Sequence, residues 1–137
     1  MHNADKIVMG AIRSNFREVS NIKGTVEAGL AVFGKSDGTG TLLKSDGVIL
    51  GISVGKDLSD TNRIAYCRKG TEVPIQVTTS FTPTIGAQVQ ISDTTGKAVT
   101  SGGTNYNAIY RKYVAGGGIK EDGTACDVAI IDFPGGL

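Results

Sequence analysis

Apolar and polar residues alternate along most of the chain in short runs that end at glycine, proline or aspartate. The clearest run covers residues 48–54, where Val48, Leu50, Ile52 and Val54 occupy every second position. Alternation with a period of two predicts a β-strand with one buried face. Because Ile49 is also apolar, we expect one end of this strand to be buried on both faces.

Eight further runs have strand-like character. They are separated by turns that contain glycine, at residues 35–40, 45–47, 69–70 and 93–96. The Gly-Gly-Gly stretch at residues 116–118 predicts a flexible segment. Pro74 cannot donate a ladder hydrogen bond, which places its strand at an edge or a bulge. Residues 109–114 fit a strand or, alternatively, a helical turn. The eight runs are residues 25–33, 41–43, 62–68, 72–78, 88–91, 97–100, 109–114 and 127–133.

The spacing of these runs predicts the fold class. About eight to nine short strands, with turns roughly every 8–12 residues and no convincing long helix, are typical of a small β-barrel or β-sandwich. Glycine supports this prediction, since 20 of the 137 residues are Gly, about twice the usual ~7%. We therefore expect an all-β protein with a single β domain over residues 25–137.

The first 24 residues have a different pattern. Ile12, Phe16 and Val19 have the spacing of one helical face, whereas residues 7–9 are β-like, so a short helix and an extended N-terminal arm both fit. The apolar residues of this arm, residues 1–24, have no obvious partner in the barrel. We therefore predict that the arm contacts a neighbouring subunit, and the candidate contact residues are Ile7, Val8, Met9, Ile12 and Phe16.

Charge limits the range of partners. The 14 basic and 13 acidic residues give a formal net charge of +1, which excludes a strong general attraction to nucleic acid or to an anionic membrane. No apolar run approaches the ~18 residues of a membrane span. We expect neither a specific nucleic-acid partner nor a membrane partner.

Candidate chemistry is sparse. The only histidine is His2, so a Ser-His-Asp triad has no base inside the fold. We interpret Cys67 and Cys126 as buried thiols of a protein made in the cytosol, although the sequence does not exclude a disulfide between them. Two cysteines without an internal histidine are too few ligands for a typical zinc site. We therefore predict a protein that is not an enzyme, with no catalytic residues, no cofactor and no metal.

Two motifs resemble ligand-binding loops. Residues 29–36 match the phosphate-binding pattern G-x-x-x-x-G-K-[ST], but residues 30–33 are β-like and the following Asp-Gly-Thr-Gly cannot start a helix well. We interpret this motif as a strand followed by a turn. Asp37, Asp46, Asp57 and Asp60 lie in loops that could bind calcium but lack the spacing of an EF-hand, and we interpret them as turn residues.

Five short motifs occur in an order that resembles small bacteriophage capsid decoration proteins, also called structural cement proteins. Together they extend over residues 26–133, about four-fifths of the chain. They are Val-Glu-Ala-Gly-Leu at 26–30, Gly-Val-Ile-Leu-Gly-Ile-Ser at 47–53, Lys-Gly-Thr-Glu-Val-Pro-Ile at 69–75, Ile-Gly-Ala-Gln-Val at 85–89 with the turn at 93–97, and Asp-Val-Ala-Ile-Ile-Asp-Phe at 127–133.

This resemblance implies a non-enzymatic virion structural protein on the outer surface of the capsid, made in the host cytoplasm. It implies binding to the major capsid protein, and self-association as a homotrimer or homodimer that bridges several capsid subunits. The alternative function is another phage virion β-module, in a tail, a fibre or a carbohydrate-binding role. The absence of Trp argues mildly against sugar binding, which commonly uses exposed aromatic rings.

Overall fold

One continuous sheet of ten strands organises the chain. The computed structural model describes residues 7–9, 18–56, 60, 62–79 and 81–135. Eight strands follow one another in the order β4-β3-β5-β6-β10-β9-β7-β8, with every neighbouring pair antiparallel, while β1 pairs with β9 and β2 pairs with β6. The strands are β1 (Ile7–Val8), β2 (Glu18–Lys23), β3 (Ala31–Lys35), β4 (Gly40–Thr41), β5 (Gly47–Lys56), β6 (Arg63–Gln76), β7 (Gln88–Ile91), β8 (Ala98–Val99), β9 (Thr104–Ile119) and β10 (Ala125–Phe133).

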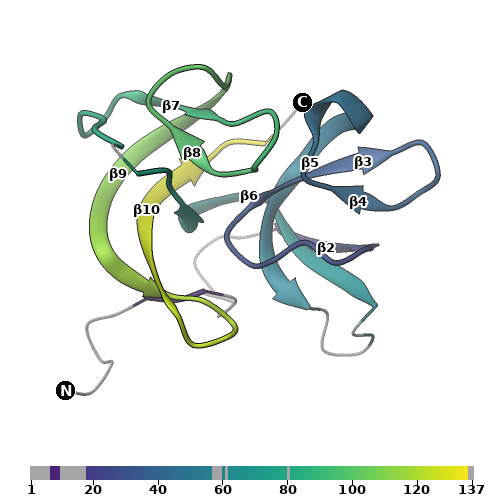
Figure 1. Ribbon diagram of the computed structural model, residues 1–137. Coiled ribbons are helices and arrows are strands. Elements are labelled where there is room, and N and C mark those ends of the chain that lie inside the picture. The colour runs from purple at the N-terminus through teal and green to yellow at the C-terminus, as the bar shows by residue number, and fades with distance from the viewer. Residues whose placement is uncertain (1–6, 10–17, 57–59, 61, 80, 136–137) are drawn as a thin grey trace.

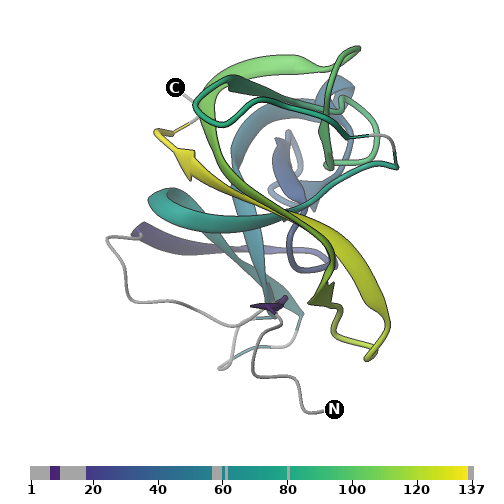
Figure 2. The same cartoon turned by 90° about the vertical axis from the view of Figure 1, so that its left-hand side faces the viewer.

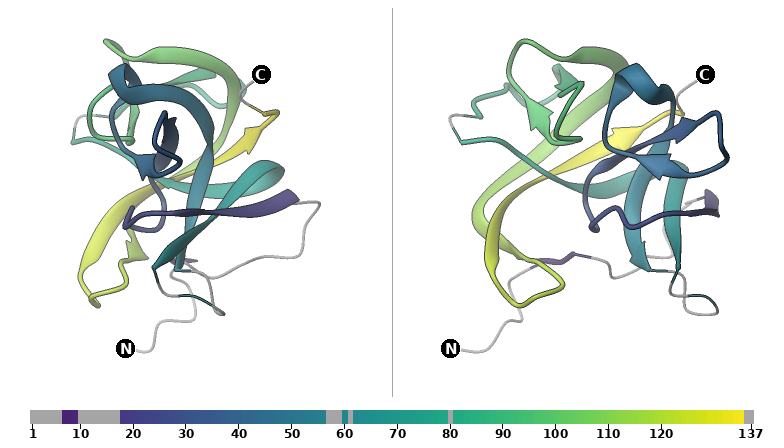
Figure 3. Two further views of the ribbon diagram at one scale, coloured as in Figure 1. Left: turned by 90° about the vertical axis from the view of Figure 1, so that its right-hand side faces the viewer. Right: turned by 45° about the vertical axis from the view of Figure 1, so that its right-hand side comes forward.

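The sheet curls into a barrel-like shape. In Figure 1, β7 to β10 form one half of the molecule, β2 to β5 form the other, and β6 passes between them. The strong bend of β9 and β10 is visible in Figure 2, and the right-hand view of Figure 3 shows β7 to β10 on one side and β2 to β5 on the other. The predicted all-β class is confirmed, with a barrel-like sheet. A short 3₁₀ turn, η1 (Lys44–Asp46), is the one helical element in the described residues.

β6 joins the two halves and differs from the prediction. The sequence predicted two strands with a turn at residues 69–70, whereas the structure has one 14-residue strand. Its first part pairs with both β2 and β5, and its second part pairs with β10. Glu72 adopts a positive φ of 53°, and such a local irregularity bends a strand without ending it. Residues that resemble a turn therefore form a bend inside a strand.

β9 is also longer than predicted. It has 16 residues and includes the Gly-Gly-Gly stretch that the sequence suggested was flexible. Gly118 lies between two partners, pairing with Cys126 of β10 and with Ile7 of β1. A Cβ atom on Gly118 would lie 2.7 Å from the Cys126 Sγ atom. Close packing inside the sheet thus favours glycine at this position. Because residues 109–114 lie within β9, the helical alternative for them is wrong.

The segment before β3 is a buried loop, whereas the sequence predicted a strand over residues 25–33. Val26, Ala28 and Leu30 are buried. The carbonyl oxygens of Val26 and Ala28 bond to two buried polar side chains, and that of Leu30 accepts the Ser53 backbone N–H. Gln76 Nε2 donates to the carbonyl oxygen of Ala28 at 2.9 Å, and Ser53 Oγ donates to that of Val26 at 3.3 Å. Buried backbone groups need such partners, so the only buried polar residues of the described chain serve to hold this loop.

Apolar side chains pack on both sides of the β3-β5-β6 region. Phe33 and Cys67 belong to the main core inside the curl, whereas Val32, Ile64 and Tyr66 belong to a second cluster on the opposite face. A strand buried on both faces has a continuous apolar run instead of strict alternation, as in the Ala-Val-Phe of β3.

A bulge changes the alternation predicted for β5. Phe33 pairs with Ile49 while Val32 pairs with Gly51, so Leu50 is an extra residue in the ladder. Ile49, Ile52 and Val54 therefore reach the main core, and Val48 is 52% exposed. The sequence pattern wrongly placed Val48 on the buried face. Counting every second residue fails across a bulge, because the extra residue reverses which side chains face the core.

Part of the predicted arm belongs to the sheet. Residues 18–23, within the segment that the sequence assigned to the arm, form β2 and pair antiparallel along β6 from Lys69 to Arg63. Ile22 packs against the second apolar cluster. The sequence signal was weak here because β2 is largely exposed and has only alternate half-buried positions.

Replacing Gln76 tests the role of the buried loop. Gln76→Leu leaves the Ala28 carbonyl oxygen without this donor, so we expect the free energy of unfolding to fall by about 1–3 kcal/mol. Urea unfolding measured by circular dichroism gives this value. Lys112→Leu, at an exposed position of β9, is the control and should change stability much less; equal losses in the two variants would refute the interpretation.

Candidate functional site

The residues predicted to contact a neighbouring subunit are only partly described. Ile7 and Val8 form β1, which runs parallel to β9 and pairs with Gly118 and Ile119 of the same chain. Ile12 and Phe16 lie outside the described residues. A contact between these four residues and a neighbouring subunit remains a prediction.

Met9 packs inside its own domain. Its backbone N–H donates to the Ile119 carbonyl oxygen at 2.7 Å, and its side chain is 2% exposed, in a cluster with Ala28 and Val128. Gly29 has a φ of +83°, and a Cβ atom there would lie 2.1 Å from the Met9 Cε atom. The chain's own loop and sheet therefore enclose this side chain, and a contact between Met9 and a neighbouring subunit remains a prediction.

The loop motifs behave as turns. Within the phosphate-loop pattern, residues 31–35 form β3, and its first three residues are buried. In the turn that follows, the Lys35 carbonyl oxygen accepts a hydrogen bond from the Gly38 N–H. The interpretation as a strand followed by a turn is confirmed. The Asp37 carboxylate accepts bonds from the Thr39 N–H and Oγ, and these bonds lower the pKa of Asp37 below its ordinary value. Asp122 repeats the arrangement with Thr124, and its pKa is lowered for the same reason.

The other loop aspartates make comparable bonds. Asp60 accepts from the Asn62 N–H at 3.0 Å, and Asp46 accepts from the Thr41 hydroxyl at 3.1 Å. Both confirm the interpretation as turn residues, while Asp57 lies outside the described residues. Among the described residues, no group of three or more His, Cys, Asp or Glu side chains is placed to hold a metal ion.

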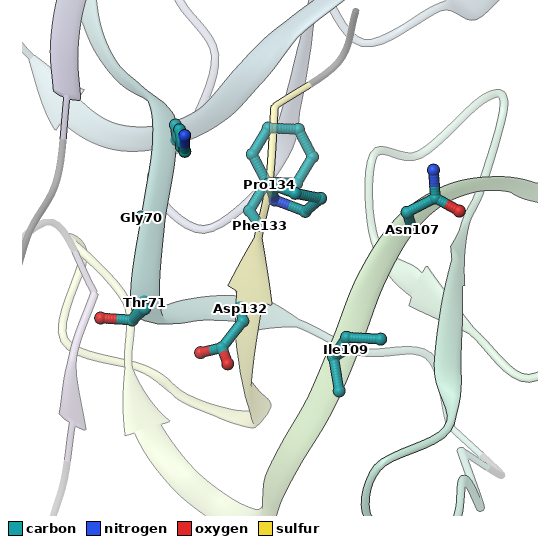
Figure 4. Close-up of a pocket in the computed structure, with 8 residues that line it drawn as sticks. Gly70, Thr71, Asn107, Ile109, Asp132, Phe133 and Pro134 are labelled. Carbon is teal, nitrogen blue, oxygen red and sulfur yellow. The ribbon is translucent and has the colours of Figure 1, made fainter.

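Three adjacent strands enclose an apolar pocket on the surface, which we call the β6–β9–β10 pocket. Its volume is about 280 Å³, and its lining includes Gly70 and Thr71 of β6, Asn107 and Ile109 of β9, and Asp132 and Phe133 of β10. Figure 4 shows the β6 residues on one side, the β9 residues on the other, and Phe133 between them. This volume lies just below the range of about 300–1,000 Å³ that is usual for small-molecule pockets.

The lining of the pocket includes two charged residues, Lys69 and Asp132. Asp132 accepts a hydrogen bond from Arg111 Nε at 2.6 Å and one from the backbone N–H of Glu72 at 3.3 Å. The exposed surface inside the pocket is almost entirely apolar. With no paired carboxylates, histidine or activated nucleophile among its lining residues, the pocket is suited to receiving an apolar group.

Sequence reasoning missed this pocket. Its residues come from three segments far apart in the chain, and residues 69–71 resembled a turn. No short motif records that Ile109, Asp132 and Thr71 lie in adjacent strands, because that proximity depends on the register of β9 against β10 and on the bend of β6.

The two cysteines are both free thiols in the structure. Cys67 is fully buried in the main core, and Cys126 is partly buried beside Gly118. Burial raises the pKa of the Cys126 thiol above its ordinary value, because the surroundings disfavour the thiolate. The disulfide that the sequence left open is not formed.

Comparison with known proteins identifies no relative: no protein-family model, no curated protein and no solved structure matches the chain. The described residues contain no helix that is both long and apolar enough to cross a membrane. The fold and the pocket thus define the chain as an all-β protein with a barrel-like sheet and a shallow apolar surface site.

Replacing Met9 tests whether the N-terminal segment packs on its own domain. Met9→Ala removes buried contacts, and we expect the free energy of unfolding to fall by about 2–5 kcal/mol. The loss should be the same at low and high protein concentration, because the contacts lie within one chain. Val19→Ala, at a 40% exposed position, is the control. A loss that grew on dilution would instead indicate a contact between subunits.

The pH dependence of thiol modification tests the environment of Cys126. Because the raised pKa leaves less thiolate at a given pH, we expect Cys126 to react with a disulfide reagent more slowly than free cysteine at pH 8, and the rate to keep rising above pH 9. Cys67 should react only after unfolding. The Cys126→Ser variant should lose the reaction of the folded protein, and a rate for the original chain equal to that of free cysteine would contradict the prediction.

Proposed function

We propose that the chain is a non-enzymatic structural protein of a bacteriophage virion. It binds the outer surface of the head and stabilises the shell by bridging major capsid subunits. The observation that carries this proposal is the order and spacing of the five motifs in residues 26–133 that resemble capsid decoration proteins.

The positions of these motifs in the fold support the proposal. Residues 47–53 lie in β5, residues 69–75 in β6, and residues 127–133 in β10. Residues 85–89 lead into β7, and the turn at 93–97 connects β7 to β8. Four of the five motifs therefore lie in strands or in the turns beside them, while residues 26–30 lie in the loop before β3. The all-β class that the resemblance implies agrees with the fold.

The physical properties of the surface suit broad and shallow docking. The net charge is only +1, and the β6–β9–β10 pocket is small and apolar. A protein that contacts several capsid subunits at once can bind firmly through weak individual contacts, because each further contact forms at a high effective concentration. A homo-oligomer would multiply these contacts.

Co-sedimentation with phage heads tests the proposed function. Purified protein is mixed with mature heads and with unexpanded proheads of the phage that encodes the chain, and each pellet is quantified. We expect saturable binding to mature heads at a fixed ratio to the major capsid protein. If the folded protein binds neither shell, the proposal fails, and a tail, fibre or carbohydrate-binding role becomes the better hypothesis.

A further inference from the structure

A large part of the surface carries no charge. Residues 73–92 and 98–110, segments of 20 and 13 residues, contain no Asp, Glu, Lys, Arg or His, although charged residues make up 20% of the whole chain. They provide β7, β8, the loop before β7 and the first part of β9. We call the exposed surface of residues 81–92 and 98–110 the neutral face.

The neutral face combines an exposed apolar residue with amides and hydroxyls. Ile85 is 71% exposed, more than any other large hydrophobic residue described. The exposed polar residues of this face are Thr82, Thr84, Gln88, Thr100, Ser101, Asn105 and Asn107. Depletion of charge around an apolar centre is characteristic of the core of a protein–protein interface.

The neutral face adjoins the β6–β9–β10 pocket. Gly86 N–H donates to the Tyr110 carbonyl oxygen at 2.8 Å, so the loop that carries Ile85 lies alongside β9. In the sheet, Gln88 pairs with Ile109, and Ile109 pairs with Asp132. The turn that carries Ile85 therefore leads into β7, the strand next to β9, and Ile109 of β9 lines the pocket.

Backbone strain also marks this region. Glu72 and Asn107 are the only described non-glycine residues with positive φ, at 53° and 64°. Asn107 lines the pocket, and the N–H of Glu72 bonds to Asp132, which lines it as well. Strained backbone is commonly retained where a surface must present a defined shape to a ligand or partner.

We propose that the neutral face and the β6–β9–β10 pocket form a two-fold interface between copies of this chain, in which Ile85 of each copy occupies the pocket of the other. This inference deepens the proposed function, which supposes a homo-oligomer, and rests on it for its biological role. An isologous contact brings each surface patch against its own copy, so a charged patch would repel itself.

The absence of charge on the neutral face makes it suitable for contact with a second copy of the same face. Gln88 bonds to Asn105 and Asn107 within the chain, but each amide group keeps a further donor or acceptor position. These remaining positions can pair with identical groups across a two-fold axis. The charged residues Asp93, Lys97 and Arg111 lie at the ends of the neutral segments, where they would form a polar rim. A partner recognised by strong charge complementarity would find few ion-pairing groups on this face.

Sedimentation velocity of the purified chain, with no capsid present, tests the inference. We expect a concentration-dependent species with twice the 14.2 kDa mass of one chain. Ile85→Asp should weaken self-association about 100-fold, because it removes buried apolar area and places a charge in the contact. Val48→Asp is the matched control: Val48 is 52% exposed on β5, and its substitution should leave association unchanged.

Thermal unfolding of both variants checks that they remain folded, which we expect because Ile85 and Val48 are exposed. The inference is overturned if the original chain is monomeric at all concentrations, or if Val48→Asp weakens association as much as Ile85→Asp. It is also overturned if Ile85→Asp abolishes binding to mature heads while self-association persists, since the shell would then be the occupant. Self-association without head binding would instead refute the proposed function and leave the interface intact.

Discussion

The structure depends on β6 being shared between the two halves of the sheet. Along its first part, β6 is hydrogen-bonded on both edges, to β2 and to β5, and along its second part it pairs with β10. Its side chains are buried toward the main core and, at Ile64 and Tyr66, toward the second cluster. Any change that straightened the bend at Glu72 would separate the half formed by β2–β5 from the half formed by β7–β10.

The bend in β6 also creates the candidate site. Gly70 and Thr71 approach β9 and β10 because the strand changes direction there, and the pocket forms where the three strands meet. The site thus arises from the same distortion that closes the sheet. Its apolar lining and its position beside the neutral face make it suitable for contacts with protein surfaces, which agrees with the proposed structural role and with the proposed self-association.

The N-terminal segment shows how packing extends a fold beyond its obvious strands. Met9 fills the space over Gly29 that a side chain at position 29 would occupy, and Gln76 holds the same loop by donating to the Ala28 carbonyl oxygen. The apolar character of Met9 suggested a partner, and the partner is the chain's own core. Sequence alone could not distinguish an intramolecular partner from a neighbouring subunit, because both bury the same side chain.

Local chemistry along the chain was sufficient to predict the all-β class, the turns at Asp37 and Asp60, and the strand within the phosphate-loop pattern. Each depends on period-two alternation or on a side chain that bonds to a residue two positions away. The continuity of β6 and β9, the shift in alternation at Leu50 and the pocket depended on pairing between distant strands. Bulges and strand register are set by which partner lies alongside, and only the tertiary structure determines that.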